Sequence, residues 1–149
     1  MSDSRDFIEW DERFMFGIPP IDKQHEKLVQ LTNNLHSACL RSKETAHYHF
    51  MEAAHKTVDY VRYHFTTEEK LMILVEYPGY GKHKTEHASF VMEILAQTQK
   101  YAVNSHLAPN RFVYYLKEWI LSHIAVSDKS MAEFIIRTEY YEKLLLLFP

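Results

Sequence analysis

The apolar residues of this chain recur every three or four positions through four long segments, and this period limits the possible folds more than any other feature. Such spacing lines one face of an α-helix with apolar side chains. It predicts helices over residues 22–41, 44–75, 80–103 and about 111–136. Asp22 and Ser42 are candidate N-caps for the first two helices, and breaks fall at Pro78, Gly79 and Pro109.

The composition supports an all-α fold. The 149 residues include only 3 Gly and 5 Pro, too few for a turn-rich sandwich or barrel, and the length suits a single domain, residues 1–149. Long helices joined by short loops place successive helices antiparallel, so we predict an up-down-up-down four-helix bundle over residues 22–136. Residues 1–20 predict an extended N-terminal arm, and residues 138–149 form a C-terminal extension that either continues the last helix or folds back.

Charge and composition narrow the partners and the compartment. A net charge of -3 without a cluster of Lys or Arg argues against nucleic acid or an anionic membrane as the main partner. The longest purely apolar run, Leu144 to Phe148, is far shorter than the roughly 18 residues that a membrane-spanning helix needs. The single Cys39 cannot form an internal disulfide and the polar start lacks the pattern of a secretory signal, so we expect a cytoplasmic protein.

The chain contains 10 histidines, and the helical phase separates those predicted to face the core from the others. A single histidine on a core face is usually a hydrogen-bonded core residue. Five on converging faces indicate a site instead, because buried imidazoles without partners are costly. This set comes from all four helices and consists of His25, His64, His83, His87 and His123. We expect the other five to lie away from it, namely His36, His47, His49, His55 and His106.

Two carboxylates extend this set. Glu68 follows His64 by four residues, so both side chains can reach one site from the same helix face. Asp128 follows His123 by five residues, and a regular helix would rotate it about 140° away. We therefore predict a π-bulge or local unwinding between His123 and Asp128, because one extra residue in the turn would realign the two side chains.

The stretch from His83 to His87, HKTEH, also has the spelling of an inverted zinc-peptidase motif with Glu86 as general base. A zinc peptidase would leave the other five candidate ligands unexplained, and helix geometry turns Glu86 away from the two histidines toward solvent or a neighbouring helix. Five imidazoles and two carboxylates exceed the four ligands that one zinc usually takes, which indicates two metal ions. Histidine and carboxylate without thiolate suit iron or manganese.

Four segments resemble the hemerythrin family, specifically its single-domain bacterial members, across about residues 8–136. These segments are GIPPIDKQH ending at His25, HFTTEEKLM from His64, YPGYGKHKTEH ending at His87 and WILSHIAVSD from Trp119. The resemblance implies two iron ions with a bridging oxo or hydroxo group. It implies that the first iron is held by His83, His87 and His123, that the second is held by His25 and His64, and that Glu68 and Asp128 bridge them.

The resemblance further implies reversible O₂ binding, for storage, delivery or sensing, without catalysis. A dry apolar pocket would then lie near the ligands, and its candidate lining residues are Phe65, Trp119, Ile124 and Val126. The alternative is a di-iron enzyme at the same centre, such as a peroxidase, an oxidase or a nitric oxide reductase. A histidine-rich site favours binding, because ferritin-like oxidases use carboxylate-rich sites.

The C-terminal extension carries Tyr140, Tyr141 and the apolar run from Leu144 to Phe148. These residues are candidates for contact with a protein acceptor or with a second copy of the chain. Packing on the chain's own bundle is an equally good interpretation, because a small apolar group on a monomer does not by itself indicate an interface.

Overall fold

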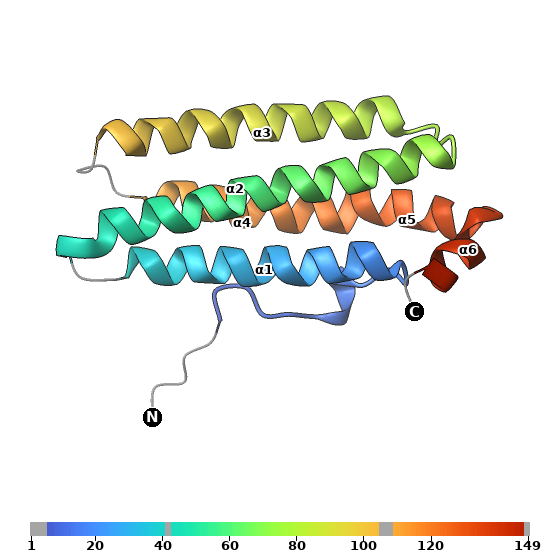
Figure 1. The fold of residues 1–149 in the computed structure, drawn as a ribbon, viewed down its shortest axis with the longest axis horizontal. Helices are drawn as coiled ribbons and strands as arrows, with labels where there is room; N and C mark the ends of the chain where they lie inside the picture. The colour runs from blue at the N-terminus through green and yellow to red at the C-terminus, as the bar shows by residue number, and fades with distance from the viewer. Residues whose placement is uncertain (1–5, 41–42, 105–108, 148–149) are drawn as a thin grey trace.

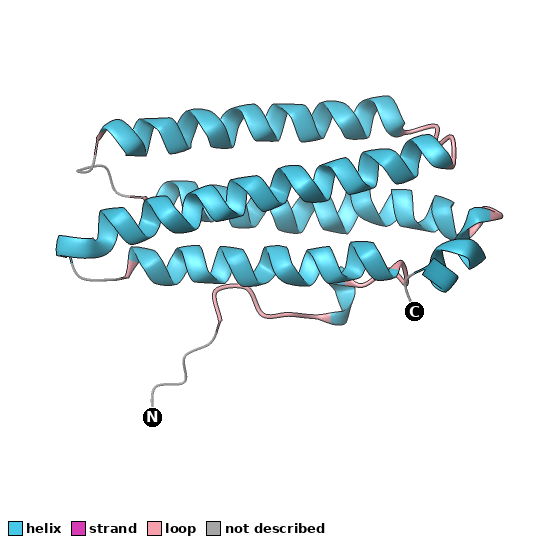
Figure 2. Cartoon of the chain, in the orientation of Figure 1, coloured by secondary structure: helices cyan, strands magenta, loops and turns pink. Residues whose placement is uncertain are grey.

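In the computed structural model of the protein, which describes residues 6–40, 43–104 and 109–147, four long rods pack side by side (Figure 1). Three of them are α1 (Pro19–Cys39), α2 (Lys43–Leu74) and α3 (Tyr80–Val103). The fourth rod consists of α4 (Asn110–His123), a π-helical turn (Ile124–Asp128) and α5 (Lys129–Ile136). The described residues form helices joined by loops, without a strand (Figure 2), and the predicted up-down-up-down four-helix bundle is confirmed.

The predicted bounds of α2 and α3 agree with the structure to within one residue, but α1 begins three residues before its predicted N-cap. Pro19 and Pro20 occupy the first turn of α1, where proline fits because the N–H that it lacks would have no partner within the helix. Asp22 therefore lies inside the helix, and its prediction as N-cap is wrong. Ser42, the other candidate N-cap, lies outside the described residues.

The Asp22 side chain instead fixes the chain that leads into α1. Its carboxylate accepts hydrogen bonds from the backbone N–H groups of Phe16 and Gly17, at 2.7 and 3.1 Å. Gly17 adopts a φ angle of +83°, which glycine reaches without steric strain and which turns the chain sharply into the helix. Asp22 is thus a tie between the N-terminal arm and the first helix.

The N-terminal arm, residues 6–18, runs alongside α1 and contains one short 3₁₀ turn, Glu12–Phe14 (Figure 1). The Asn33 side chain on α1 accepts a hydrogen bond from the backbone N–H of Ile8 at 2.7 Å and donates one to the carbonyl oxygen of Ile8 at 2.9 Å. The Phe7 ring stacks on the His36 ring, with 4.0 Å between their centroids. Together with the Asp22 contacts at its other end, these contacts attach the arm to α1 at both ends, and the predicted extended N-terminal arm is confirmed.

Two apolar clusters fill the bundle, and a polar layer lies between them. On α1, His25 lies between Ile21, which belongs to the smaller cluster, and Leu28, which belongs to the larger one. The same order recurs on α2, where Glu68 lies between Phe65 of the larger cluster and Met72 of the smaller. Polar side chains in the middle of the bundle are thus enclosed by apolar packing from both ends.

The C-terminal extension folds back on its own bundle instead of continuing α5. A further helix, α6 (Tyr140–Leu147), lies against the end of the bundle where α1 begins (Figure 1). Leu144 is buried in the smaller apolar cluster, and the Tyr141 hydroxyl donates a hydrogen bond to the carbonyl oxygen of Gly17 at 2.8 Å. Leu146 and Leu147 are exposed, and Phe148 lies outside the described residues. Contact of this extension with an acceptor or a second copy stays a prediction.

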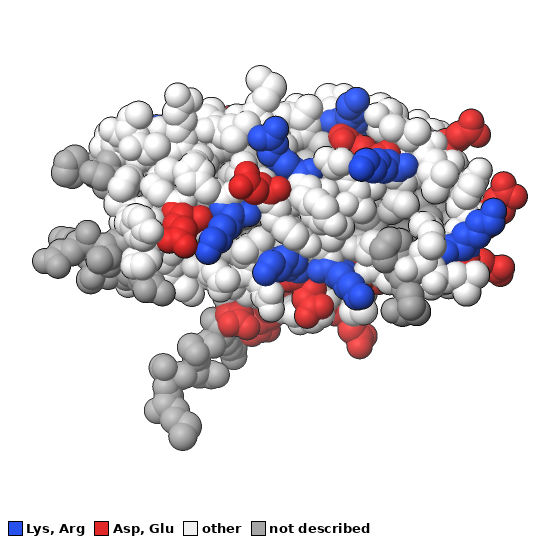
Figure 3. All heavy atoms as spheres, viewed as in Figure 1, with Lys and Arg blue, Asp and Glu red and all other residues white. Residues whose placement is uncertain are grey.

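The surface view in Figure 3 shows Lys and Arg side chains interspersed with Asp and Glu over one face of the bundle, so this face carries no field of a single sign. In the described ranges, none of the helices combines the length and apolarity that a bilayer crossing requires.

Replacing Asp22 with Ala removes both hydrogen bonds that it accepts from the arm. We expect the free energy of unfolding of the metal-free protein to fall by about 1–3 kcal/mol, because two backbone N–H groups lose a charged acceptor. Chemical denaturation followed by circular dichroism measures this loss. Glu26→Ala, at an exposed carboxylate on the same helix, is the control and should change the stability by less than about 0.5 kcal/mol. Equal losses of unfolding free energy in the two variants would contradict the role of Asp22 in holding the arm on α1.

Candidate metal centre

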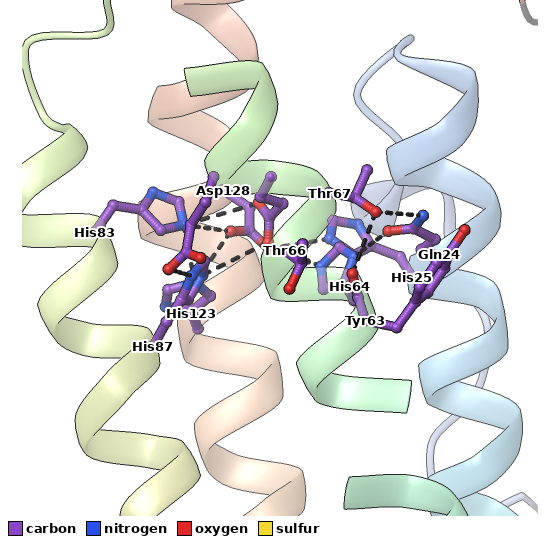
Figure 4. Close-up of polar contacts among 12 residues, drawn as sticks. Gln24, His25, Tyr63, His64, Thr66, Thr67, His83, His87, His123 and Asp128 are labelled. Atoms are coloured by element: carbon purple, nitrogen blue, oxygen red, sulfur yellow. Dashed lines mark hydrogen bonds and ion pairs between the residues drawn. The ribbon is translucent and has the colours of Figure 1, made fainter. Parts of the chain in front are cut away.

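The seven side chains that the sequence selects as ligands meet in the middle of the bundle. Figure 4 shows His83, His87, His123 and Asp128 converging from α3 and the fourth rod, with His64 and His25 beside them on α2 and α1. All seven are buried, and the most exposed is His123, at 6%. Five imidazoles and two carboxylates are therefore shielded from bulk water.

The seven side chains form two groups that share both carboxylates. One group contains His83, His87 and His123, the other contains His25 and His64, and Glu68 and Asp128 belong to both. Within each group, the ligand atoms all lie within 4.8 Å of one another. This grouping is the one that the family resemblance implies.

The two oxygens of Asp128 divide between the two groups. Oδ1 lies 3.1 Å from Nε2 of His83 and 3.1 Å from Nε2 of His123, whereas Oδ2 lies 3.0 Å from Nε2 of His25. On α2, Oε1 of Glu68 lies 2.8 Å from Nε2 of His64, and its Oε2 faces His83 at 3.7 Å. Carboxylates placed in this way can bridge a pair of metal ions.

A π-helical turn, Ile124–Asp128, brings Asp128 into the centre. The N–H of Lys129 donates to the carbonyl oxygen of Ile124, five residues back, which is the hydrogen bond of a π-helix. The extra residue aligns Asp128 with His123 although five positions separate them. The π-bulge that the spacing predicts is confirmed.

Acceptors outside the centre fix the orientation of two imidazole rings. Nδ1 of His25 lies 2.9 Å from the carbonyl oxygen of Phe14 in the arm. Nδ1 of His64 lies 2.7 Å from Oε1 of Gln24, whose amide donates to the Thr67 hydroxyl at 3.1 Å (Figure 4). Because these oxygens can only accept, Nδ1 carries the proton in both rings. Each Nε2 then presents a lone pair to the centre, which is the form that binds a metal.

Several inner polar atoms of the centre face one another without a hydrogen bond. Among the described residues, the buried side-chain atoms without a hydrogen-bond partner include Nε2 of His64, both carboxylate oxygens of Glu68 and Oδ1 of Asp128. Nε2 of His123 lies 3.1 Å from Nε2 of both His83 and His87. Each buried group left unpaired costs about 1–3 kcal/mol. Cations among these atoms would satisfy them, so the residues fit a metal centre.

Burial shifts the pKa values within the centre. Burial, and after it the charge of Asp128, raises the pKa of Glu68 well above its usual value. Burial also acts to raise the pKa of Asp128, but the close contacts of its oxygens with the histidine rings, led by His123, outweigh burial and hold this pKa well below its usual value. Burial and the charges of His123 and His83 lower the pKa of His87 to about 2, so this imidazole is neutral near pH 7 and can act as a ligand.

A cavity of about 10 Å³ lies beside the centre, with room for about one water-sized molecule. Phe65, Trp119 and Ile124, three of the four residues expected in an O₂ pocket, line this cavity. Val126 does not, because its side chain is 67% exposed. The wide turn that brings Asp128 inward rotates Val126 outward, so the expectation for Val126 is wrong.

Four further apolar side chains line the cavity and are absent from the predicted set, namely Leu28, Val61, Phe90 and Ile120. Each lies three residues from a ligand, after it on α1 and α3 and before it on α2 and α4. Since successive rods are antiparallel, these four positions fall at one level of the bundle, one turn from the ligands. Spacing from the predicted ligands was therefore the signal that identifies them.

The remaining histidines lie away from the centre. His55 is exposed on α2, as predicted, and His36 packs against Phe7 of the arm. His47 and His49 are partly exposed, and His106 lies outside the described residues.

Glu86 does not have the position of a general base. It turns toward the fourth rod and contacts the outer nitrogen of His123, Nδ1, at 3.1 Å. The peptidase interpretation of HKTEH is not supported, because a base for metal-bound water must lie on the Nε2 side of the rings.

Known proteins provide an independent comparison. The family model described as the hemerythrin HHE cation binding domain matches residues 17–135. A protein named Bacteriohemerythrin from Stenotrophomonas maltophilia is 27% identical over 126 residues, which cover 85% of this chain and 80% of that protein. Bacteriohemerythrin from Pseudomonas aeruginosa is 29% identical over 121 residues, which cover 81% of this chain and 76% of that protein.

A solved structure agrees in fold. The crystal structure of wild-type hemerythrin matches with a TM-score of 0.80 at 22% identity and covers 87% of this chain and 98% of its own. At this identity the match supports the fold alone. The family model is the decisive finding, since it spans most of the chain and includes every ligand from His25 to Asp128, and the chain therefore belongs to the hemerythrin family.

Proposed function

We propose that the protein binds O₂ reversibly at a di-iron centre, for storage, delivery or sensing, and that it does not catalyse a reaction there. One arrangement supports this function above all: two histidine groups that share two carboxylates adjoin a cavity with room for about one small molecule. His83, His87 and His123 would hold one iron, His25 and His64 the other, and Glu68 and Asp128 would bridge them. Two ferrous ions held in this way would supply the electrons for reversible O₂ binding.

The donor set supports iron. The cluster contains imidazole and carboxylate ligands and no thiolate, and the single Cys39 lies at the far end of α1. The two groups are unequal, because one contains three histidines and the other two. The two-histidine side therefore offers fewer protein ligands and is the better candidate for an open position.

Aromatic rings cover the ligands on the cavity side. The Phe65 ring stacks on His87 with 3.7 Å between centroids, and the Trp119 ring stacks on His123 at 4.3 Å. Phe90 stacks in turn on Trp119 at 3.7 Å. These rings hold the imidazoles in place and exclude water from the cavity, as reversible binding requires.

The size of the cavity supports binding of a small ligand over turnover of a larger substrate. A volume of about 10 Å³ admits about one water-sized molecule. Three larger surface hollows, of about 180, 500 and 520 Å³, are lined by none of the seven ligands. A small reactant can approach the centre, whereas an organic substrate would require the aromatic rings to move.

Adding O₂ to the anaerobically reduced iron protein and then removing it tests the proposal. We expect a visible charge-transfer absorption that appears with O₂ and disappears under vacuum or argon, through several cycles. Irreversible oxidation that consumes an added reductant in repeated turnovers would overturn the proposal in favour of a di-iron enzyme.

Replacing Glu68 with Gln removes the negative charge of one carboxylate that both histidine groups share. We expect the bound iron to fall from two ions per chain to about one or fewer, since a metal pair needs its bridging carboxylates. Iron analysis after anaerobic loading and desalting measures this ratio. Asp59→Asn, at an exposed position on the same helix, should keep the wild-type ratio. Two tightly held ions in Glu68→Gln would refute a bridging role.

Replacing Ile124 with Ala enlarges the cavity and opens it to water. We expect the O₂-bound protein to autoxidise severalfold faster, because water and protons reach the centre more easily. The decay of the O₂-dependent absorption in air-saturated buffer gives the rate. Val126→Ala, two residues away but exposed, is the matched control and should decay like the wild type. The lining role of Ile124 is wrong if the two variants decay at the same rate.

A further inference from the structure

Glu86 is the acidic residue of the HKTEH stretch, and it is not one of the seven ligands. It lies on α3 between the ligands His83 and His87, and its side chain is 32% exposed. Its Oε2 atom lies 3.1 Å from Nδ1 of His123 and accepts a hydrogen bond from the Ser127 hydroxyl at 2.5 Å. One carboxylate oxygen thus contacts two residues of the neighbouring rod.

These two contacts lie at the two ends of the π-turn. His123 is the last residue of α4, and Ser127 precedes Asp128 at the end of the turn. A π-turn is rare and is less regular than an α-helix, so its register depends on contacts from outside the helix. Glu86 supplies such a contact from α3. Through one oxygen, Glu86 links His123, with which Asp128 must be aligned, to Ser127, which directly precedes Asp128.

The acceptor of His123 also differs from those of the other oriented rings. His25 and His64 present Nδ1 to neutral oxygens, a backbone carbonyl and a side-chain amide. His123 presents Nδ1 to a carboxylate, which accepts a stronger hydrogen bond than a neutral oxygen does. An outer carboxylate fixes the orientation of a metal-binding imidazole and raises the basicity of the opposite nitrogen.

We propose that Glu86 is a positioning residue for the three-histidine side of the centre. It holds the His123 ring so that Nε2 faces the inner carboxylates, and it holds the π-turn through Ser127 so that Asp128 stays in phase. Glu86 acts through these two residues and not on a bound ligand, because it contacts Nδ1, the outer nitrogen of His123. This inference rests on the metal centre of the proposed function.

Two substitutions separate positioning from charge. Glu86→Ala removes the acceptor, and we expect iron at the tighter of the two sites to bind about 10–100-fold more weakly. Glu86→Gln keeps an oxygen that accepts from Nδ1 and an amide that can donate to the Ser127 hydroxyl, so we expect it to restore most of the affinity. Glu93→Ala, at an exposed carboxylate two turns along α3, should bind like the wild type. Anaerobic Fe²⁺ titration against a chromophoric chelator measures all four proteins.

A second measurement reports on the contact without any metal. In metal-free protein labelled with ¹⁵N-histidine, the Nδ1–H proton of His123 should exchange slowly with water in the wild type and in Glu86→Gln. It should exchange rapidly in Glu86→Ala. A change in overall stability alone would not selectively change the exchange rate of this proton.

The outcomes separate the two proposals. Wild-type affinity in Glu86→Ala, or equal losses in the Ala and Gln variants, would overturn positioning by Glu86. A wild-type protein that binds fewer than two iron ions, while the His123 proton stays protected and depends on Glu86, would overturn the di-iron centre and support the positioning of His123. Both proposals are supported if Glu86→Ala binds iron weakly and Glu86→Gln restores the affinity. The His123 proton should then also be protected in Glu86→Gln.

Discussion

The burial of two carboxylates and five imidazoles in the middle of the bundle is the constraint on which the rest of the structure depends. A buried charge or lone pair without a partner lowers the stability of the fold. The lone pairs of these oxygens and nitrogens therefore converge where cations can satisfy them. Convergence requires a contribution from all four rods, because each supplies at least one ligand. A shift of one rod by a single residue would rotate its ligand by about 100°, so the centre fixes the register of the whole bundle.

The acceptors behind the ligands connect the centre to distant parts of the chain. The arm reaches His25 through the carbonyl oxygen of Phe14, and Asp22 and Asn33 hold the arm on α1. The arm is therefore part of the centre, although it contributes no ligand. On the opposite side of the bundle, Glu86 links α3 to both ends of the π-turn in the same indirect way.

The cavity arises from the same antiparallel arrangement. One layer of apolar side chains, each a single turn from a ligand, comes from all four rods and closes over the centre. Stacked rings of Phe65 and Trp119 press against two of the imidazoles. The positions that hold the ligands and the positions that cover them thus follow from one helical period, and the space between them has room for about one water-sized molecule.

The sequence by itself determined the helices, the bundle, all seven candidate ligands and the π-turn, because helical phase depends only on spacing along the chain. Tertiary structure decided what depends on contacts between segments. Local sequence predicted Asp22 as an N-cap, but in the structure its carboxylate accepts hydrogen bonds from two N–H groups of the arm. Glu86 contacts His123 on another rod, which spacing along the chain does not predict. The exposed position of Val126 is not such a case, because the bulge that the spacing predicts for Asp128 also turns Val126 to solvent. The extension folds back because Leu144 finds buried apolar contacts at the bundle's end, which no local pattern specifies.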